Sequence, residues 1–556
     1  MAGSNELVFV PLGGIGEIGM NMAAYGFGPR HDRKWIVVDC GVTFAGPDLP
    51  GIDLIMADPA FLEEQGKNVL ALVLTHSHED HYGAVLELWS DFDLPVYAGA
   101  FTAAMLSAKR ISNGYTDNLP VRLFEPGKPF QIGPFKIEAI NMAHSIPESF
   151  ALLIETEIGR ALHTGDWKID TNPIVGPPTD IARLKKIGQE GSPLALVSDS
   201  TNAMKEGESP SERDVAKTLE KLIAEAPNRV AVTTFASNVG RIISIARAGQ
   251  KAGRQVVISG RALHRVTAIA REMGMLDDLE PFFDHDVFGQ LPRKKTLLIC
   301  TGSQGEPRAS VAKISKGEHP AIDLDPGDLM IFSSWAIPGN EKAVIQNQND
   351  FVDRGVRIIT NADKLVHVSG HPRRGEMSQL YDWVKPDVLV PAHGEAMHLE
   401  AHAALGRELG IEKVISARNG DMVRLLPNAR HFPGEVGTGT LYLDGEILCT
   451  PEESGVRGRR RLSFGGLIAV SFCVDDKGNL ISDPEVEAEG IPLLEGDEDF
   501  VIDLVEKTTR SVLKSIPPKR RNNPDKLADA VRGAVRGEVG AHWGRRPNVM
   551  VFVHTV

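Results

Sequence analysis

Three histidines and two carboxylates stand within six consecutive residues, His76 to His81 (HSHEDH), directly after the apolar run Asn68 to Thr75. Imidazole and carboxylate groups are good ligands for zinc and manganese. The segment offers four usable donors, at His76, His78, Asp80 and His81. Because one ion would leave some of these donors idle, the pattern predicts a hydrolytic centre that binds two metal ions. A solvated, charge-rich turn is the alternative interpretation.

Two later residues stand in the same position relative to a strand. His144 follows the expected strand Phe135 to Asn141, and Asp166 follows a pair of expected strands that ends at His163. Loops at the strand ends of a rigid sheet commonly display functional groups. We therefore expect His144 and Asp166 to join the HSHEDH segment as metal ligands.

The glycine-rich segment Gly14 to Gly19 (GIGEIG) matches the dinucleotide-binding fingerprint GxGxxG, and Asp39 lies at a suitable distance downstream. A dinucleotide fold needs a crossover helix of about ten or more residues behind the glycines. Gly26, Gly28 and Pro29 interrupt that space before the next strand. We therefore predict a glycine turn between antiparallel strands and no dinucleotide site.

Length and composition limit the class of protein. A chain of 556 residues exceeds one ordinary core, and 42% hydrophobic with 24% charged residues is typical of a folded globular protein. The net charge of −14 argues against capture of nucleic acid by the whole surface, but not by a local basic groove. The four cysteines form no CxxC pair, which favours the cytoplasm. We find neither a signal peptide nor a membrane anchor.

From about Ser209 to Thr360 the chain alternates helical stretches with short apolar strands. This alternation predicts a parallel α/β sheet that forms a domain inserted into the first one. Loops after three of its strands are rich in small polar residues, as in Ala236 to Asn238. Because the carboxyl ends of parallel strands form the ligand crevice, we expect these loops to face the metals.

The C-terminal part is expected to form a small α+β domain. It contains an apolar strand, Gly466 to Val474, helical stretches around 498–515 and 523–540, and a closing strand, Asn548 to Val556. Basic residues gather between Arg457 and Arg461, at Lys519 to Arg521, and at Arg545 and Arg546. A solvated surface is the simpler interpretation, and contact with nucleic acid or a neighbouring subunit is the alternative.

Several motifs resemble one group of hydrolases. HSHEDH and the two strand-end residues after it resemble the metal motifs of the metallo-β-lactamase fold. The inserted domain, with Asp199 in SDSTN, His371 in HVSGH and His393 in PAHGE, resembles the β-CASP nucleases. The opening PLGGIGEIGMN, the stretch GVTFAGPDLPGID and the C-terminal α+β domain are similar to bacterial ribonuclease J. The resemblance spans nearly the whole chain.

The resemblance implies an α/β fold, namely a metallo-β-lactamase αββα sandwich with an inserted β-CASP parallel α/β domain and a small C-terminal α+β domain. It divides the sandwich into residues 1–207 and 363–445, with the insert at 208–362, a linker at 446–465 and the C-terminal domain at 466–556.

The resemblance also implies how the ligands divide between two divalent metal ions. One ion would be bound by His76, His78, His144 and Asp166, and the second by Asp80, His81, His393 and the shared Asp166. Asp199 would orient a ligand from behind. His371 would face the scissile phosphate, either as a contact or as the acid that protonates the leaving oxygen. Asp80, Asp199 and His371 are the expected catalytic residues, and zinc is the expected metal, with manganese as the alternative.

The implied activity is hydrolysis of RNA phosphodiester bonds from a 5′-monophosphate end towards the 3′ end, with internal cleavage as a second mode, in rRNA processing and mRNA decay. Bound metals lower the pKa of water towards ~7. Hydroxyls, imidazole and backbone N–H groups suit a terminal phosphate. The candidates are Ser237, Asn238, His367, Val368, Ser369, Gly370 and His371. Asp444 in LDG is the candidate ligand of a structural calcium or magnesium ion.

The expected partners are an RNA substrate, a second or further copies of the chain in a homodimer or homotetramer, and other RNA-decay proteins. Three alternatives remain. A small-molecule hydrolase with the same HxHxDH motif needs no long insert after Asp199. A DNA nuclease of the crosslink-repair branch lacks a histidine at the position of His393. A non-catalytic RNA-binding scaffold is disfavoured because every motif position holds the expected residue type.

Overall fold

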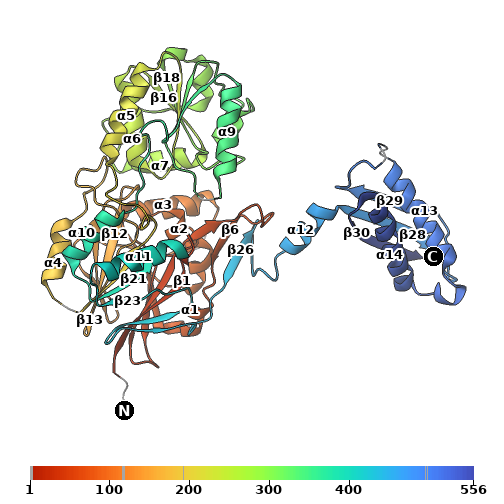
Figure 1. The fold of residues 1–556 in the computed structure, drawn as a ribbon, viewed down its shortest axis with the longest axis horizontal. Helices are drawn as coiled ribbons and strands as arrows, with labels where there is room; N and C mark the ends of the chain where they lie inside the picture. The colour runs from red at the N-terminus through yellow and green to blue at the C-terminus, as the bar shows by residue number, and fades with distance from the viewer. Residues whose placement is uncertain (1–3, 116–118, 192, 338, 495, 497–498) are drawn as a thin grey trace. The chain divides into compact units, whose positions relative to one another are not determined.

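The computed structural model describes residues 4–115, 119–191, 193–337, 339–494, 496 and 499–556. The chain forms two compact units (Figure 1). The larger unit comprises Met1–Phe44 and Ile55–Leu441, and the smaller comprises Ala45–Leu54 and Tyr442–Val556. Residues 45–54 thus group with the C-terminal part, because the Asp53 N–H donates to Leu443 O and the Arg460 side chain contacts Asp48. The remaining predicted boundaries stay predictions.

Two large sheets form the core of the larger unit. The first has the order β25 (Arg430–Phe432), β24 (Met422–Leu426), β1 (Glu6–Gly13), β3 (Met22–Gly28), β4 (Lys34–Val38), β7 (Val69–Val73), β8 (Val96–Ala98) and β9 (Val121–Leu123). The second has the order β10 (Phe130–Ile132), β11 (Phe135–Met142), β12 (Ser149–Thr156), β13 (Gly159–His163), β14 (Leu194–Asp199), β21 (Val388–Ala392) and β23 (Lys413–Val414).

Alternate residues of the second sheet face two different apolar layers. Leu152 and Ile154 on β12 pack between the two sheets, whereas Ala151 and Leu153 pack on the other side. That outer layer is covered by α4 (Ile181–Gln189), α10 (Arg374–Val384) and α11 (Ala396–Glu408). The helices of the other half are α1 (Ala60–Gln65), α2 (Glu79–Tyr82) and α3 (Ala100–Ser112). This architecture confirms the expected αββα sandwich.

Strands β1 and β3 pair antiparallel, with Val8 opposite Gly26, and only the two-residue strand β2 (Ile15–Gly16) lies between them. The predicted glycine turn is therefore confirmed. Gly14 has a φ of +85°, and a Cβ there would lie 2.2 Å from the Asn21 Oδ1 atom. The glycine allows the turn to approach a side chain that belongs to the site described below.

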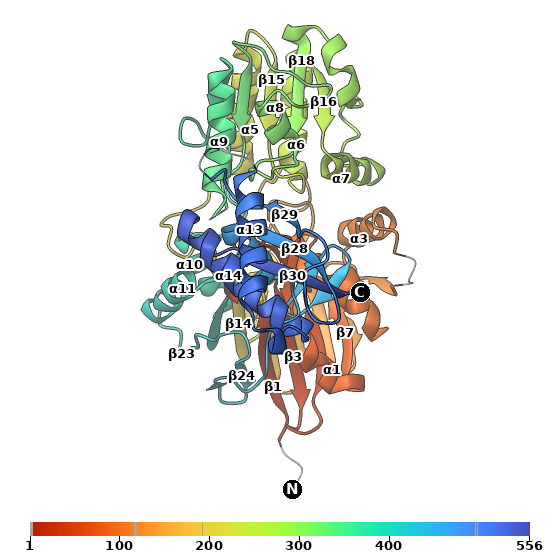
Figure 2. The same cartoon turned by 90° about the vertical axis from the view of Figure 1, so that its right-hand side faces the viewer.

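The inserted domain is a parallel α/β sheet, as predicted. Its strand order is β17 (Phe283–Asp284), β16 (Gln255–Ser259), β18 (Thr296–Cys300), β15 (Val230–Thr233), β19 (Leu329–Phe332) and β20 (Arg357–Ile359). Its helices are α5 (Glu212–Glu225), α6 (Val239–Lys251), α7 (Arg261–Glu272), α8 (Ser310–Ser315) and α9 (Glu341–Asp353). Figure 2 shows α7 of the insert beside α3 of the sandwich.

The smaller unit contains the sheet β29 (Glu485–Glu489), β28 (Leu467–Val474) and β30 (Asn548–Thr555) with the helices α13 (Phe500–Ser515) and α14 (Pro524–Trp543). Alternate residues of β28, such as Ile468 and Val470, are buried in its apolar core. Position 498, where we expected the first helix to begin, lies outside the described residues. Among the described helices, none is long and apolar enough to cross a bilayer.

Candidate metal centre

Loops at the ends of several strands bring all seven predicted metal ligands into one cluster. The HSHEDH loop follows β7, His144 follows β11, Asp166 follows β13 and His393 follows β21. Their donor atoms form two groups, and within each group the atoms lie within 4.8 Å of one another. The first group is His76, His78, His144 and Asp166, and the second is Asp80, His81, Asp166 and His393.

Asp166 lies at the centre of both groups. Its Oδ2 atom lies close to the Nε2 atoms of His81 (3.3 Å), His393 (3.6 Å), His144 (3.7 Å) and His76 (3.9 Å). Ligands that bind zinc tetrahedrally at 2.0–2.1 Å are separated from one another by about 3.3 Å. The Oδ1 atom of Asp166 is buried and has no hydrogen-bond partner among the described residues. Spacing and donor set therefore fit small divalent cations.

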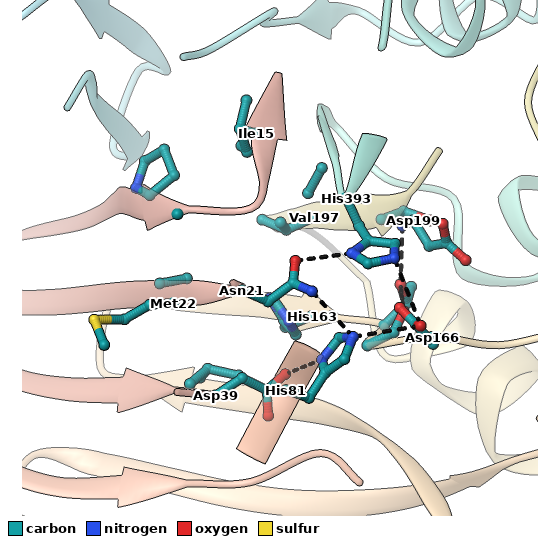
Figure 3. A pocket seen from close by; sticks show the side chains of 18 of the residues that line it. Ile15, Asn21, Met22, Asp39, His81, His163, Asp166, Val197, Asp199 and His393 are labelled. Atoms are coloured by element: carbon teal, nitrogen blue, oxygen red, sulfur yellow. Dashed lines mark hydrogen bonds and ion pairs between the residues drawn. The ribbon is translucent and has the colours of Figure 1, made fainter. Parts of the chain in front are cut away.

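Four of the imidazoles are oriented by a hydrogen bond at Nδ1. The partner is Asp39 Oδ2 for His81 (2.7 Å), Gly370 O for His144 (2.7 Å), Asn21 Oδ1 for His393 (2.8 Å) and Thr75 Oγ1 for His76 (3.0 Å). A proton held at Nδ1 leaves the Nε2 lone pair free on the side that faces Asp166. Figure 3 shows Asn21 beside His393 and Asp39 beside His81, each on the side of the ring away from Asp166.

Electrostatics keep the first group ready to bind a cation. Burial, followed by the neighbouring imidazoles, holds the pKa of His76 and of His144 well below the ordinary value. Burial also lowers the pKa of His78 to about 4. Although burial opposes ionisation of Asp166, the surrounding His393 and His81 imidazoles hold its pKa well below the usual range. Neutral His76, His78 and His144 beside an ionised carboxylate are in the form that binds metal. In the second group, burial lowers the pKa of His81, but Asp166, Asp80 and Asp39 outweigh this effect and hold it well above the ordinary value, so a cation would displace a proton from this ring.

Asp199 and His371 form a pair at the rim of the cluster. The His371 Nδ1 atom lies 2.8 Å from Asp199 Oδ2, while Asp199 Oδ1 accepts from the Thr201 N–H and hydroxyl. Burial lowers the pKa of His371, but Asp199 and Asp166 outweigh this effect and raise it to about 9. The His371 side chain is 20% exposed, whereas that of Asp199 is fully buried. Asp199 thus orients the His371 ring through its Nδ1 atom.

A small cavity of about 30 Å³ lies behind the second ligand group (Figure 3). His81, Asp166 and His393 line it together with apolar side chains such as Phe9 and Val38. Its volume is enough for about one water molecule. The cavity therefore has no room for a substrate, whereas the ligand Asp80 and the neighbouring His371 are 30% and 20% exposed.

The predicted phosphate-binding residues lie on two neighbouring segments, the end of β15 and the loop 366–371. The Phe235 and His367 rings lie 6.4 Å apart across these segments. The Ser369 hydroxyl oxygen accepts from Asn202 Nδ2 (2.9 Å), and the Gly370 carbonyl orients a metal-cluster histidine as described above. Val368 is buried, and burial lowers the pKa of His367 to about 3. Ser237 is half-buried beside them.

The side chain of Asn238 has a different contact from the one predicted. Its Oδ1 atom accepts from the Arg241 N–H (2.9 Å) as the N-cap of α6, and its amide points to Glu212 (3.5 Å). Asparagine is a favoured N-cap residue because its side-chain oxygen satisfies a free helical N–H group. Both side-chain contacts of Asn238 are therefore with residues of the inserted domain.

Arg241, which the sequence did not single out, is fully buried beneath the loop 366–371. Its guanidinium donates to both carboxylate oxygens of Glu212 (2.9–3.0 Å) and to Ser333 Oγ (2.6 Å). It also donates to Val366 O (3.0 Å), at the start of the loop. Arg241 therefore joins the insert to the segment that carries His371.

Asp444 lies in the smaller unit, where its Oδ2 atom forms an ion pair with Arg459 (2.6 Å). A guanidinium thus neutralises the carboxylate that we considered for a structural cation. In the part of the chain that the structure describes, no group of three ligand-type side chains includes Asp444.

Besides Arg241, two residues that orient metal-cluster histidines were missed in the sequence. Asp39 has a φ of +63°, an uncommon conformation for a residue with a side chain, and orients His81. It follows directly after a strand, so the strand-end pattern used for His144 would have found it. Asn21 contacts both His81 and His393, and it has no comparable signal because the contact depends on the glycine turn.

Comparisons with known proteins cover most of the chain. Residues 29–178 match the metallo-β-lactamase superfamily, 227–351 the ribonuclease J β-CASP domain, 355–416 the Zn-dependent metallo-hydrolase RNA specificity domain, and 454–556 the ribonuclease J C-terminal domain. A solved structure of a protein of unknown function from Enterococcus faecalis shares the fold, with a TM-score of 0.53 at 16% identity over 75% of this chain and 99% of that chain.

Full-length relatives agree with these family matches. Ribonuclease J from Sinorhizobium meliloti is 49% identical over 556 residues, which covers 100% of this chain and 98% of that protein. Ribonuclease J from Corynebacterium glutamicum is 35% identical, which covers 99% of this chain and 76% of that protein. The chain belongs to the ribonuclease J family.

Proposed function

We propose that this protein is a metal-dependent ribonuclease that hydrolyses RNA in the 5′-to-3′ direction from a 5′-monophosphate end. The observation that carries the proposal is the buried Asp166 carboxylate, which four oriented imidazoles surround, with the Asp199–His371 pair at its rim. This arrangement supplies sites for two cations and, beside them, one histidine available to the substrate.

The two ligand groups would each hold one divalent ion. We assign the first ion to His76, His78, His144 and Asp166, and the second to Asp80, His81, His393 and Asp166. When bound, such ions lower the pKa of water towards ~7 and stabilise negative charge on a phosphoryl group. Zinc suits the imidazole-rich set best, and manganese is the alternative.

His371 acts on the leaving group in this proposal. Its Nδ1–H is held by Asp199, so its Nε2–H can be donated to the O3′ atom as the P–O3′ bond breaks. Burial lowers the pKa of His371, but the Asp199 carboxylate at its Nδ1 atom favours the protonated ring and raises that pKa, as suits a group that acts as an acid. The released nucleotide leaves with its original 5′-phosphate and a free 3′-hydroxyl. The phosphorus that separates from O3′ becomes the new 5′-phosphate of the shortened RNA.

The 5′-terminal phosphate would bind between the end of β15 and the loop 366–371. The groups that we assign to it are the hydroxyls of Ser237 and Ser369, the His367 imidazole, and the backbone at Val368 and Gly370. The Gly370 carbonyl accepts from the His144 Nδ1–H, which ties this loop to the metal cluster. That link would fix the distance between the end of the RNA and the bond that is cleaved.

The cellular setting is part of the same proposal. We place the enzyme in the cytoplasm, in rRNA processing and mRNA decay, with internal cleavage as a second mode. We also propose a homodimer or homotetramer that works with other RNA-decay proteins. The support is membership of the ribonuclease J family and the match to an RNA specificity domain.

Three otherwise identical RNAs with 5′-monophosphate, 5′-triphosphate and 5′-hydroxyl ends test the proposal. Rapid release of mononucleotides from the monophosphate RNA alone is expected, and EDTA or His76→Ala should abolish it. His31→Ala is the matched control, because His31 is exposed before β4, at the opposite end of that strand from Asp39. Equal degradation of all three RNAs would contradict the phosphate pocket, and full activity of His76→Ala would contradict the metal mechanism.

A further inference from the structure

Helix α12 (Val456–Gly465) of the smaller unit carries arginines in two different states. Arg459 pairs with Asp444 and Arg460 with Asp48, so both are neutralised within the unit. Arg461 is exposed and forms no ion pair or side-chain hydrogen bond with any described residue. The basic segment predicted from the sequence therefore separates into a structural part and an uncompensated part.

Arg461 lines a hollow of about 430 Å³ together with Phe464, Gly465, Arg545 and Arg546. The Arg545 guanidinium donates to the Phe464 carbonyl (3.3 Å), which joins the end of α12 to the segment before β30. A Cβ on Gly465 would lie 3.1 Å from Arg546 O, so glycine allows the two segments to approach closely. The hollow is therefore built by two chain segments that hold each other in place.

The lining of the hollow has excess positive charge and an exposed aromatic ring. Arg461, Arg545 and Arg546 have no carboxylate partner in the described residues, and no acidic residue lines the hollow. Phe464 is 70% exposed at the same place. Arginine binds phosphate oxygens with two parallel hydrogen bonds. Groups that neutralise phosphates beside a ring on which a base can stack are typical of sites for single-stranded nucleic acid.

We propose that this hollow binds a single-stranded segment of RNA, with its arginines on consecutive phosphates and one base stacked on Phe464. An acidic protein surface would satisfy the charges but would leave the exposed ring without a flat partner, so RNA fits both observations. The choice of RNA rests on the proposed function. The hollow shares no residue with the metal centre, because all of its residues belong to the smaller unit.

The expected consequence is tighter binding of long RNA without a change in the chemical step. Each phosphate contact on a single strand contributes about 0.7 to the slope of log affinity against log salt. Removing two arginines should therefore lower that slope by about 1.4. A very short 5′-monophosphate substrate, which occupies only the metal centre, should be cleaved with unchanged kcat and KM.

The test compares two double variants of the full, metal-loaded protein. Arg545→Ala/Arg546→Ala removes two charges from the hollow. Lys519→Ala/Arg520→Ala removes two exposed charges from the short helix Pro518–Arg520 of the same unit, outside the hollow. Binding is measured by fluorescence anisotropy with a phosphorothioate RNA of about 16 nucleotides, the upper site size of such grooves. We expect about tenfold weaker binding for the first variant and less than about twofold for the second.

Phe464 separates stacking from charge. Phe464→Leu should weaken binding by about fivefold or more, while Phe464→Tyr, which keeps the ring, should bind as the unchanged protein does. Circular dichroism and melting temperature check that each variant is folded. Equal losses in the two double variants, or unchanged binding in Phe464→Leu, would overturn the proposal.

Sedimentation of the same variants distinguishes an RNA site from a subunit contact. If Arg545→Ala/Arg546→Ala dissociates an oligomer while RNA binding stays the same, the hollow is a protein interface and the proposal is wrong. Binding is measured without turnover. If the proposed ribonuclease activity is wrong, the digestion test shows it separately, because the 5′-monophosphate, 5′-triphosphate and 5′-hydroxyl RNAs would all stay intact.

Discussion

Two buried polar clusters of the larger unit, around Arg241 and around Asp166, differ in one respect. Around Arg241, every guanidinium nitrogen donates to an oxygen, so the cluster is complete. Around Asp166, one carboxylate oxygen has no hydrogen-bond partner among the residues that the structure describes, and imidazole Nε2 atoms face that carboxylate from several sides. Buried polar groups are normally satisfied, so an incomplete cluster indicates a missing ligand. A complete cluster indicates a support for its neighbours.

The two clusters are linked through the loop 366–371. Arg241 binds the carbonyl of Val366 at its start, and the Gly370 carbonyl orients His144 at its end. The cluster around Arg241 thus holds the loop 366–371 in place, and this loop orients a histidine of the cluster around Asp166. If this difference is real, removing a ligand should abolish activity, while changes at the supporting positions should have graded effects.

His76→Ala should have the largest effect. The substitution removes one imidazole from the first ligand group, so RNA cleavage should fall by roughly four orders of magnitude or more. The measurement is the initial rate on 5′-monophosphate RNA, together with the metal content. His31→Ala should retain both. A His76→Ala protein with normal metal content and rate would show that the cluster is not the catalytic centre.

His371→Ala should come next. Its ring lies at the rim, so turnover should fall about 10²- to 10³-fold while the metal content stays intact. Asp199→Asn should have a smaller effect of the same kind, because it only orients the ring. If His371→Ala loses as much metal as Asp80→Ala does, His371 is a metal ligand and not a group that acts on the substrate. That outcome has a structural basis, since His371 also lies within 4.8 Å of Asp166 and His393 donors.

Asn21→Ala should mainly change metal affinity. Asn21 accepts from the His393 Nδ1–H, and loss of such a supporting group typically weakens metal binding 10- to 100-fold. At saturating metal the rate should return close to normal. Titrating the apo-protein with zinc while measuring RNA cleavage gives both the metal affinity and the rate at saturating metal. A rate that stays low at every metal concentration would contradict the supporting role of Asn21.

Arg241→Met should have the smallest effect on the chemical step and the largest on folding. It leaves the buried Glu212 carboxylate without its cationic partner, which should cost about 3–5 kcal/mol of stability. The folded fraction should lose preference for 5′-monophosphate over 5′-hydroxyl RNA by a few fold. Glu212→Met/Arg241→Met is the matched control, and it should recover stability but not the preference. If both variants prefer 5′-monophosphate RNA as strongly as the unchanged protein does, Arg241 does not support the phosphate pocket.

Sequence patterns predicted those parts of the site that follow a strand. His144 and Asp166 were expected because each comes directly after an apolar run, and strand ends of one sheet lie near each other. The parallel sheet of the insert was expected for a similar reason, since helices alternate with apolar strands. Its edge strand β17 has only two residues, Phe283 and Asp284, and so leaves no periodic signal.

The remaining contacts depend on tertiary structure. Nothing local distinguishes Arg241 from an exposed arginine of an amphipathic helix, because its partner Glu212 lies on a different helix. Asn238 shows the opposite case, in which a residue type suited to phosphate instead caps α6. Residues 45–54 group with the C-terminal part through contacts such as Arg460 with Asp48, which no periodic pattern encodes.

The number of bound metal ions per chain tests the central claim most directly. Elemental analysis of the dialysed protein should give two divalent ions per chain, and one for His78→Ala, which removes a ligand of the first group only. Asp166→Ala should retain none, because the same carboxylate serves both groups. Two ions retained by Asp166→Ala, or a single ion in the unchanged protein, would contradict the shared two-metal centre.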